Sequence, residues 1–335
     1  MVLALQRQPT VVHKYSLAEF RNWRLNNQTA CHSDTSLFVE YDFLNYYQVA
    51  TGAEVFVLLL DLGQGDKAYI VFDKKVTSEE EVIFTSSSFS PYAGLVTASS
   101  SATKIIEAYS ILTTYLMSEK RKGEKLKIEI RLPPTQIYPR FEIDQWALWG
   151  LNYQITTGYL GRYINQLNLH VNRNRKRRLK ALAIDLTNSK FLVSEKVEKE
   201  VFDLMVENRQ SRHGVKLTHS LSDFEFLSRL SGGKFLKIWS LEHEGHICAA
   251  AIVFRDTGAN ILQYLGQSNC GYIMGSQDLV LSEIIEWSNA EDKPLLLGTS
   301  TRPETSHREI NSGLDSYKSS WGAKVYSCYR FTLNY

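Results

Sequence analysis

The sequence has few cysteines and no metal-binding spacing among them. Its four cysteines, Cys31, Cys248, Cys270 and Cys328, are far apart in the 335-residue chain, and no C-x-x-C pair occurs. Small disulfide-rich domains and structural zinc sites both need closely spaced cysteines. The pattern therefore argues against both classes and favours reduced thiols in the cytoplasm, and we expect no metal site.

Long apolar runs are also missing. The apolar stretch at residues 2–5 is shorter than the roughly 7 to 15 residues of a secretory signal. The most apolar internal runs, 55–62 and 249–254, fall short of the about 20 residues that cross a bilayer, and they are typical of buried strands. We therefore expect a soluble protein with no integral membrane insertion.

Proline is scarce and the overall charge is nearly balanced. With 7 prolines, 44% apolar and 22% charged residues, the composition is that of folded globular proteins. A chain of 335 residues has room for two domains of ordinary size. The net charge of +2 is too small to imply nucleic-acid binding by the whole molecule.

One segment departs from this balance. Six cations fall within eight positions: Arg173, Arg175, Lys176, Arg177, Arg178 and Lys180. The surrounding segment, 159–182, is polar and helical in propensity, so it predicts a domain junction. We expect an amino-terminal domain at 1–166, a basic connector helix at 167–183 and a carboxy-terminal domain at 184–335.

The periodicity of the second half predicts helices and strands in alternation. Helices are expected at 195–208, 221–230, 277–288 and 309–321, and strands at 235–241, 246–254, 260–266, 294–298 and 324–333. This order predicts an α+β domain in which helices cover a mostly antiparallel, partly mixed sheet.

The first half carries weaker signals of the same kind. Ser16 and Glu19 form a capping-box pattern before a helix at 17–25. Strands at 54–61 and 68–72 are separated by a hairpin turn, and a helix at 102–120 precedes an extended segment at 125–132 that ends at Pro133 and Pro134.

Several motifs resemble the Fem-type transferases of the GNAT superfamily. These are residues 249–254, 263–268 and 283–287, the run 297–304 with its glycine and small hydroxyl residues, and the closing segments 311–314 and 317–323. Residues 88–95 resemble the loop that these two-domain proteins carry at the domain interface, and 172–180 is similar to their basic connector.

The resemblance implies tandem GNAT folds, each a mostly antiparallel mixed sheet flanked by helices. It also implies transfer of an acyl or aminoacyl group from an activated donor onto an amine of a cell-surface or metabolite precursor. Acyl-CoA, aminoacyl-tRNA and an acyl carrier protein all remain open as donors. The alternative is a catalytically inactive GNAT-fold binding or partner protein, because one fold hosts many functions.

The donor site is where the sequence departs from the family. The glycine-rich pyrophosphate loop of CoA-using GNATs is not intact between residues 267 and 276. Gly275, Ser276 and Gln277 stand at a helix start, where free N–H groups can bind a phosphate of acyl-CoA. The same residues can serve only to cap the helix.

Other candidate residues follow from the resemblance. Tyr264, with Gln263 beside it, lies on the strand that borders the acceptor site in the family, and its phenol can protonate a leaving group. A core position is the alternative for Tyr264. Ser90 and Tyr92 are expected to bind substrate between the domains.

The segment after residue 298 supplies the remaining candidates. Thr299, Ser300 and Arg302 suit a carbonyl, phosphate or carboxylate of the substrate, with Ser300 a candidate catalytic group; a plain turn after the strand is the alternative. Glu304 is a candidate general base, as is His307.

Cations supply the last binding candidates. Lys318 can bind an anionic group of the substrate or can belong to a solvated helix face. The basic run 173–180 can grip tRNA phosphates or can be a solvated connector helix.

Overall fold

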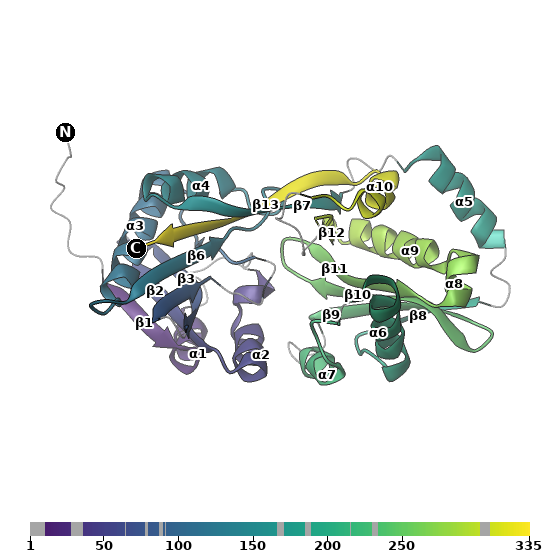
Figure 1. Ribbon diagram of the computed structural model, residues 1–335, viewed down its shortest axis with the longest axis horizontal. Coiled ribbons are helices and arrows are strands. Elements are labelled where there is room, and N and C mark those ends of the chain that lie inside the picture. Colours follow the sequence, from purple (N-terminus) through teal and green to yellow (C-terminus); the bar gives the residue numbers. More distant parts are fainter. Residues whose placement is uncertain are drawn as a thin grey trace. The chain divides into compact units, whose positions relative to one another are not determined.

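The structure is a computed structural model that describes residues 11–27, 36–63, 65–77, 80–86, 90, 92–165, 171–184, 189–214, 216–229, 234–301 and 309–335. The chain forms two compact units (Figure 1). Unit 1 comprises Met1–Gly158 and Cys328–Tyr335, and unit 2 comprises Tyr159–Ser327.

Unit 1 begins with a strand and two helices, and its first helix starts at a capping box. The Ser16 hydroxyl accepts a hydrogen bond from the Glu19 N–H, and the Glu19 carboxylate accepts one from the Ser16 N–H, as the sequence predicts. The elements are β1 (Val12–Ser16), α1 (Leu17–Asn26), η1 (Leu37–Val39), α2 (Tyr41–Thr51), β2 (Glu54–Asp61), β3 (Lys67–Val76), β4 (Glu81–Thr85), β5 (Val96–Thr97), α3 (Ala102–Ser118), β6 (Lys125–Arg131), α4 (Phe141–Gly150) and the start of β7 (Gln154–Ile164).

The sheet of unit 1 is buried on both faces. Its strand order is β1-β2-β3-β4-β6, followed by the end of β13 (Lys324–Asn334), and the β4–β6 pair is parallel. On β2, residues 56, 58 and 60 share a core with α3, whereas residues 55, 57 and 59 share a core with α1 and α2. Burial on both faces explains why residues 55–60 of β2 form an unbroken apolar run.

Unit 2 repeats this arrangement of helices and strands. Its elements are the end of β7, α5 (Arg173–Ile184), β8 (Ser189–Ser194), α6 (Lys199–His213), α7 (Leu221–Arg229), β9 (Leu236–His243), β10 (His246–Arg255), β11 (Asn260–Gln267), α8 (Asn269–Met274), α9 (Ser276–Ala290), β12 (Leu295–Thr299), α10 (Ser312–Ser320) and the start of β13.

The sheet of unit 2 has the order β8-β9-β10-β11-β12-β7-β13, and its β11–β12 pair is parallel. One face packs against α9, through a core that includes Ala251, Leu281 and Ile284. The other face carries Tyr264, which contacts Phe224 of α7 edge-on, so helices cover both sides of this sheet (Figure 1).

The two units have matching element orders. In each, a strand, two helices and three strands precede a helix, a strand that pairs in parallel with the third of those three, a further helix and a final strand. The final strands are shared, because β7 supplies residues from 159 onward to unit 2 and β13 supplies 328–335 to unit 1. The tandem α+β architecture is therefore as the sequence predicts.

One predicted segment is wrong. The chain from residue 159 is expected to be helical, but Tyr159 and Tyr163 belong to strand β7. The strand is rich in β-branched and aromatic residues, and such side chains favour a half-buried strand: Ile155, Thr156, Thr157, Tyr159, Tyr163 and Ile164. The next helix among the described residues is α5 (Arg173–Ile184), which carries the basic run.

Neither a membrane span nor a metal cluster occurs among the described residues. No helix among them is long and apolar enough to cross a membrane. Within the same residues, no group of three His, Cys, Asp or Glu side chains is placed to hold a metal ion.

Candidate functional site

Each unit contains a pair of parallel strands, and the two pairs differ in the number of residues that are paired. In unit 1, β4 and β6 pair at five positions, and the Ser86 N–H then donates to the Glu129 carbonyl at 2.8 Å. In unit 2, β11 and β12 pair only at Asn260–Leu295 and Ile261–Leu296. The remaining residues of these two strands form no β11–β12 pair, so the strands diverge.

A bulge lies on β11 just after this divergence begins. Ile252 pairs with Tyr264 and Val253 pairs with Leu262, so Gln263 has no partner residue on β10. Such an extra residue bends its strand and re-aims neighbouring side chains, and bulges are frequent next to active sites. The diverging strands and the bulge at Gln263 define the candidate site.

Tyr264 follows the bulge and makes a specific polar contact. Its phenol oxygen accepts a hydrogen bond from the Thr218 N–H at 3.2 Å and lies 2.9 Å from His219 Nδ1. Burial lowers the pKa of the His219 imidazole to about 4, against a smaller opposing effect of Asp223. The imidazole is therefore neutral at pH 7, and the Tyr264 phenol is held by two polar groups.

The end of β12 is held by a buried lysine. Lys318 of α10 donates from Nζ to the carbonyl oxygens of Gly298 at 2.9 Å and Thr299 at 2.7 Å. Burial lowers the pKa of its ammonium group to about 8; Asp315 opposes this shift and Arg162 adds to it. Thr299 itself is exposed.

An ion pair lies next to Lys318 in unit 2. Arg162 of β7 and Asp315 of α10 form a two-pronged pair, with N–O distances of 2.8 and 2.6 Å. The Arg162 hydrogen bonds hold the pKa of the Asp315 carboxyl below its usual range. This geometry, in which two guanidinium nitrogens, Nε and Nη2, engage one carboxylate, is the stronger form of ion pair and fixes α10 against β7.

Ser300 lies inside this arrangement and not at its surface. Its side chain is fully buried. Its N–H donates to the Leu160 carbonyl at 2.7 Å, and its carbonyl accepts from the Asn311 N–H at 2.8 Å. These contacts connect the end of β12 to β7 and to the start of α10.

The start of α9 is covered by α5. Gly275 and Ser276 are buried, and a Cβ at Gly275 would stand 3.0 Å from Arg178 and from Leu182. The Gln277 N–H donates to the Gln267 side chain at 3.3 Å. Of the three predicted phosphate contacts, only Gln277 is half-exposed.

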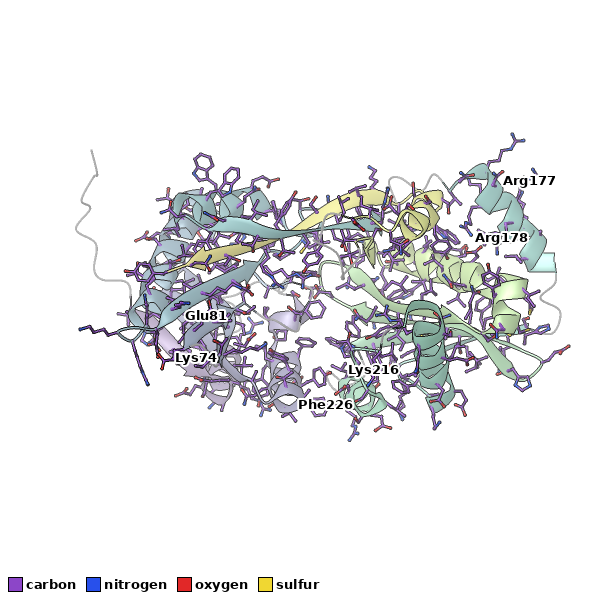
Figure 2. All side chains as sticks on the ribbon, viewed as in Figure 1. Lys74, Glu81, Arg177, Arg178, Lys216 and Phe226 are labelled. Atoms are coloured by element: carbon purple, nitrogen blue, oxygen red, sulfur yellow. The ribbon has the colours of Figure 1, made fainter. Side chains whose placement is uncertain are left out.

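Two cations of the basic run hold α5 in place. The buried Asp278 carboxylate pairs with Arg175 and Arg178 and accepts a hydrogen bond from Tyr317 at 3.1 Å. Arg175 also lies over the rings of Tyr317 and Trp321. The other four cations of the run are exposed: Arg173, Lys176, Arg177 and Lys180. Figure 2 shows Arg177 extending from α5.

Comparison with known proteins concerns the fold. No family model and no curated protein matches the sequence. FemX aligns with 96% of this chain and 96% of its own length, at 11% identity and a TM-score of 0.67. A protein of unknown function from Bacteroides thetaiotaomicron aligns with 96% of this chain and 99% of its own, at 9% identity and a TM-score of 0.59. L-PGS from Bacillus licheniformis aligns with 80% and 81%, at 14% identity and a TM-score of 0.50.

The chain has a Fem-like GNAT fold. The resemblance found in the sequence is thereby confirmed at the level of fold, and the identities are too low to carry more than the fold. In this GNAT fold, the diverging strands β11 and β12 belong to the second of the two repeats.

The Fem-like fold brings some predicted residues together. Lys318 contacts Thr299 directly, and Ser300 follows in the same turn. Gln263 and Tyr264 are neighbours at the bulge. Arg302, Glu304 and His307 lie outside the described residues.

Two predicted residues belong to the other repeat of the fold. Ser90 and Tyr92 are buried in unit 1, where the Ser90 hydroxyl donates to the Tyr92 carbonyl at 2.7 Å. The Tyr92 ring packs edge-on against Phe38, with centroids 5.5 Å apart. Their predicted role in binding substrate stays a prediction.

Sequence reasoning missed the residues that support the site from a distance. His219 reaches Tyr264 from 45 positions away, and Arg162 reaches Asp315 from 153 positions away. No spacing rule connects residues so far apart. The bulge at Gln263 was also missed, because the extra residue only shifts the alternation of inward and outward side chains by one position, and β11 is eight residues long.

Proposed function

We propose that this chain is a transferase that moves an acyl or aminoacyl group from an activated donor onto an amine. The reaction site of the proposal is the point in unit 2 where β11 and β12 diverge. The observation that supports it is the contrast between two paired positions in unit 2 and five in unit 1. The Fem-like fold supports the same reaction class.

Acyl transfer to an amine has two requirements. The amine must attack as a neutral nucleophile, and the carbonyl that it attacks must be polarised by fixed donors. Where two parallel strands separate, backbone N–H groups are released from the ladder and stay in fixed positions. In the proposal, the backbone of β11 beyond Ile261 supplies these donors.

Side chains at the diverging strands take separate roles in the proposal. Gln263 and Thr299 bind the substrates, and the Tyr264 phenol, held by Thr218 and His219, protonates the leaving group. Lys318 fixes the end of β12 through two carbonyls. Because Ser300 is fully buried, its proposed role is to hold the turn after β12 and not to touch substrate.

The donor is proposed from the surroundings of α9. Since α5 covers Gly275 and Ser276, donor phosphates would contact Gln277 and the exposed Arg178. Acyl-CoA fits these contacts as the first candidate. The other four exposed cations of the basic run favour aminoacyl-tRNA as the second candidate, because a row of cations suits a phosphate backbone.

The acceptor is proposed by class only. It is an amine on a cell-surface or metabolite precursor. No residue described at the site distinguishes an amino sugar from a peptide amine.

The experiment that tests the donor is thermal unfolding with acetyl-CoA, longer acyl-CoAs and free CoA. A ligand at about 100 times its Kd stabilises the folded state by about 2.7 kcal/mol, which raises the Tm measurably. We expect Thr299→Trp, at an exposed position at the end of β12, to abolish this rise. Thr114→Trp, an exposed threonine on α3 of unit 1, is the matched control and should keep it.

The outcomes separate the candidates. No rise with any CoA compound removes acyl-CoA as donor and leaves aminoacyl-tRNA to be tested by direct binding. No rise in Tm with any CoA compound, together with no binding of aminoacyl-tRNA, would contradict the transferase proposal and favour a binding protein.

A further inference from the structure

Three sulfur atoms gather beside α8, outside the groups that the proposed reaction uses. Cys270 is exposed on α8, and its Sγ lies 3.6 Å from Sδ of Met274, one turn further on. Cys248 is buried on β10, and its thiol donates to the His246 carbonyl at 3.7 Å. The neighbouring Cys270 adds to the rise that burial causes in the pKa of the Cys248 thiol. A buried and an exposed thiol are therefore neighbours, as exchange chemistry requires.

The backbone holds the two cysteines together. Ala249 pairs with Gln267 at the end of the β10–β11 ladder, so Cys248 stands opposite Ser268, the N-cap of α8. The Ser268 N–H donates to the Cys248 carbonyl at 2.9 Å. A Cβ at Gly271 would stand 2.0 Å from the same carbonyl oxygen, so this approach requires glycine. Cys270 lies between these two contacts, which fix it against Cys248.

We propose that Cys248 and Cys270 form a reversible disulfide when the protein meets a small disulfide oxidant such as glutathione disulfide. The Cys270 thiolate attacks one sulfur of the oxidant, which breaks its S–S bond and releases one glutathione thiolate. The Cys248 thiolate then attacks Sγ of Cys270 and displaces the second glutathione. Two protein thiols are oxidised, one glutathione disulfide is reduced, and the two protons pass to the glutathione thiolates.

The order of these steps follows from exposure and acidity. Cys270 is accessible to the oxidant and Cys248 is not. Burial, and then the neighbouring Cys270, raise the pKa of the Cys248 thiol. Only the thiolate attacks a disulfide, so the second step should be slow at neutral pH and faster as the pH rises.

The position of the disulfide matters for the proposed function. Cys270 lies one turn before Gly275, where α8 gives way to α9. If the transferase proposal holds, the disulfide would form next to the proposed donor site at the start of α9. The disulfide itself does not rest on that proposal, and its test uses no donor.

The test uses the purified full chain and glutathione disulfide. After incubation at several pH values between about 7 and 9, around the ordinary thiol pKa of about 8.5, remaining thiols are alkylated and the protein is digested for mass spectrometry. We expect a peptide pair joined through Cys248 and Cys270, formed faster at higher pH and reversed by dithiothreitol. Amide hydrogen exchange of residues 269–274 should be at least several-fold slower in the oxidised protein.

Variants assign the two steps. Cys248→Ala should stop at a stable glutathione adduct on Cys270, whereas Cys270→Ser should give no reaction at Cys248. Cys328→Ser, at a buried cysteine of unit 1, is the control and should keep the disulfide. A glutathione adduct on Cys270 that persists in the unaltered protein at every pH would overturn the proposal, as would a disulfide from either cysteine to Cys31 or Cys328.

Discussion

The side-chain nitrogen of Lys318 lies 2.7 Å from the carbonyl oxygen of Thr299. The contact joins α10 to the end of β12, at the point where the strand leaves its neighbour. Lys318 also bonds the Gly298 carbonyl, so one ammonium group satisfies two successive backbone acceptors. Removing it would free the end of the strand.

Lys318→Met tests this contact. We expect the transferase rate to fall about 10- to 100-fold, because small displacements of groups that position substrate have effects of this size. Folding stability should fall by about 1 to 3 kcal/mol, since two backbone carbonyls are left without their donor. The measurements are kcat/KM and the Tm. Lys324→Met, at an exposed lysine of β13, is the control, and a full rate in Lys318→Met would contradict the assignment.

Tyr264→Phe separates a structural tyrosine from a catalytic one. Loss of the phenol leaves the Thr218 N–H and His219 without their partner, so we expect a loss of stability of about 1 to 3 kcal/mol. If the phenol protonates the leaving group, kcat should also fall about 100-fold or more. Tyr272→Phe, at an exposed tyrosine of α8, should change neither quantity. Reduced stability with normal kcat would make Tyr264 structural only.

The pH dependence of stability reports on His219. Its pKa is about 4 in the folded protein and near 6.5 when unfolded, so the unfolded chain binds more protons between these values. This contribution is fully present above pH 6.5 and falls away as the pH drops toward 4. It amounts to about 3 kcal/mol, because each pKa unit is worth about 1.4 kcal/mol.

Comparison with His219→Asn isolates this effect. The free energy of unfolding of the unaltered protein should exceed that of the variant at neutral pH, and the difference should shrink steadily as the pH falls toward the folded-state pKa of about 4. His246→Asn, at an exposed histidine, should give a difference that does not change in this way. A constant difference for His219→Asn would mean that the imidazole titrates normally.

The exposed cations of α5 can be tested against RNA. Replacing Arg173, Lys176, Arg177 and Lys180 with Gln should weaken tRNA binding and reduce its salt dependence, by about 0.7 to 0.9 in log–log slope for each phosphate that is no longer neutralised. The control replaces Arg121, Lys122 and Lys125 of unit 1, which are also exposed. Arg175→Gln should instead lower stability, because it leaves the buried Asp278 with less compensation. Equal binding by both multiple variants would remove the tRNA candidate.

The sequence predicted those elements whose side chains are buried in a regular pattern. Strand β2 has the predicted bounds, and β10, β11 and α9 differ from theirs by one or two residues. Helix α2 was missed because aromatic residues such as Tyr41 and Tyr47 favour strands when taken alone, and the core that these two join is formed by distant residues.

Prediction of the site was limited for a related reason. The segment around Thr299 and Lys318 could be selected because its residue types follow a buried strand and a helix. The divergence of β11 from β12 is a matter of pairing between strands, and pairing leaves no local trace. The neutral state of His219 likewise depends on burial by residues of several elements.

Strand β13, which the two units share, affects how unit 1 is completed during synthesis on the ribosome. Unit 1 includes residues 328–335, which pair with β6, so its sheet stays open at that edge after residue 158 has been made. At about 5 to 20 residues per second, the missing strand arrives roughly 10 to 30 seconds later. During that interval β6 is an unpaired edge on a nascent chain, which is the stage at which a ribosome-associated chaperone would protect it.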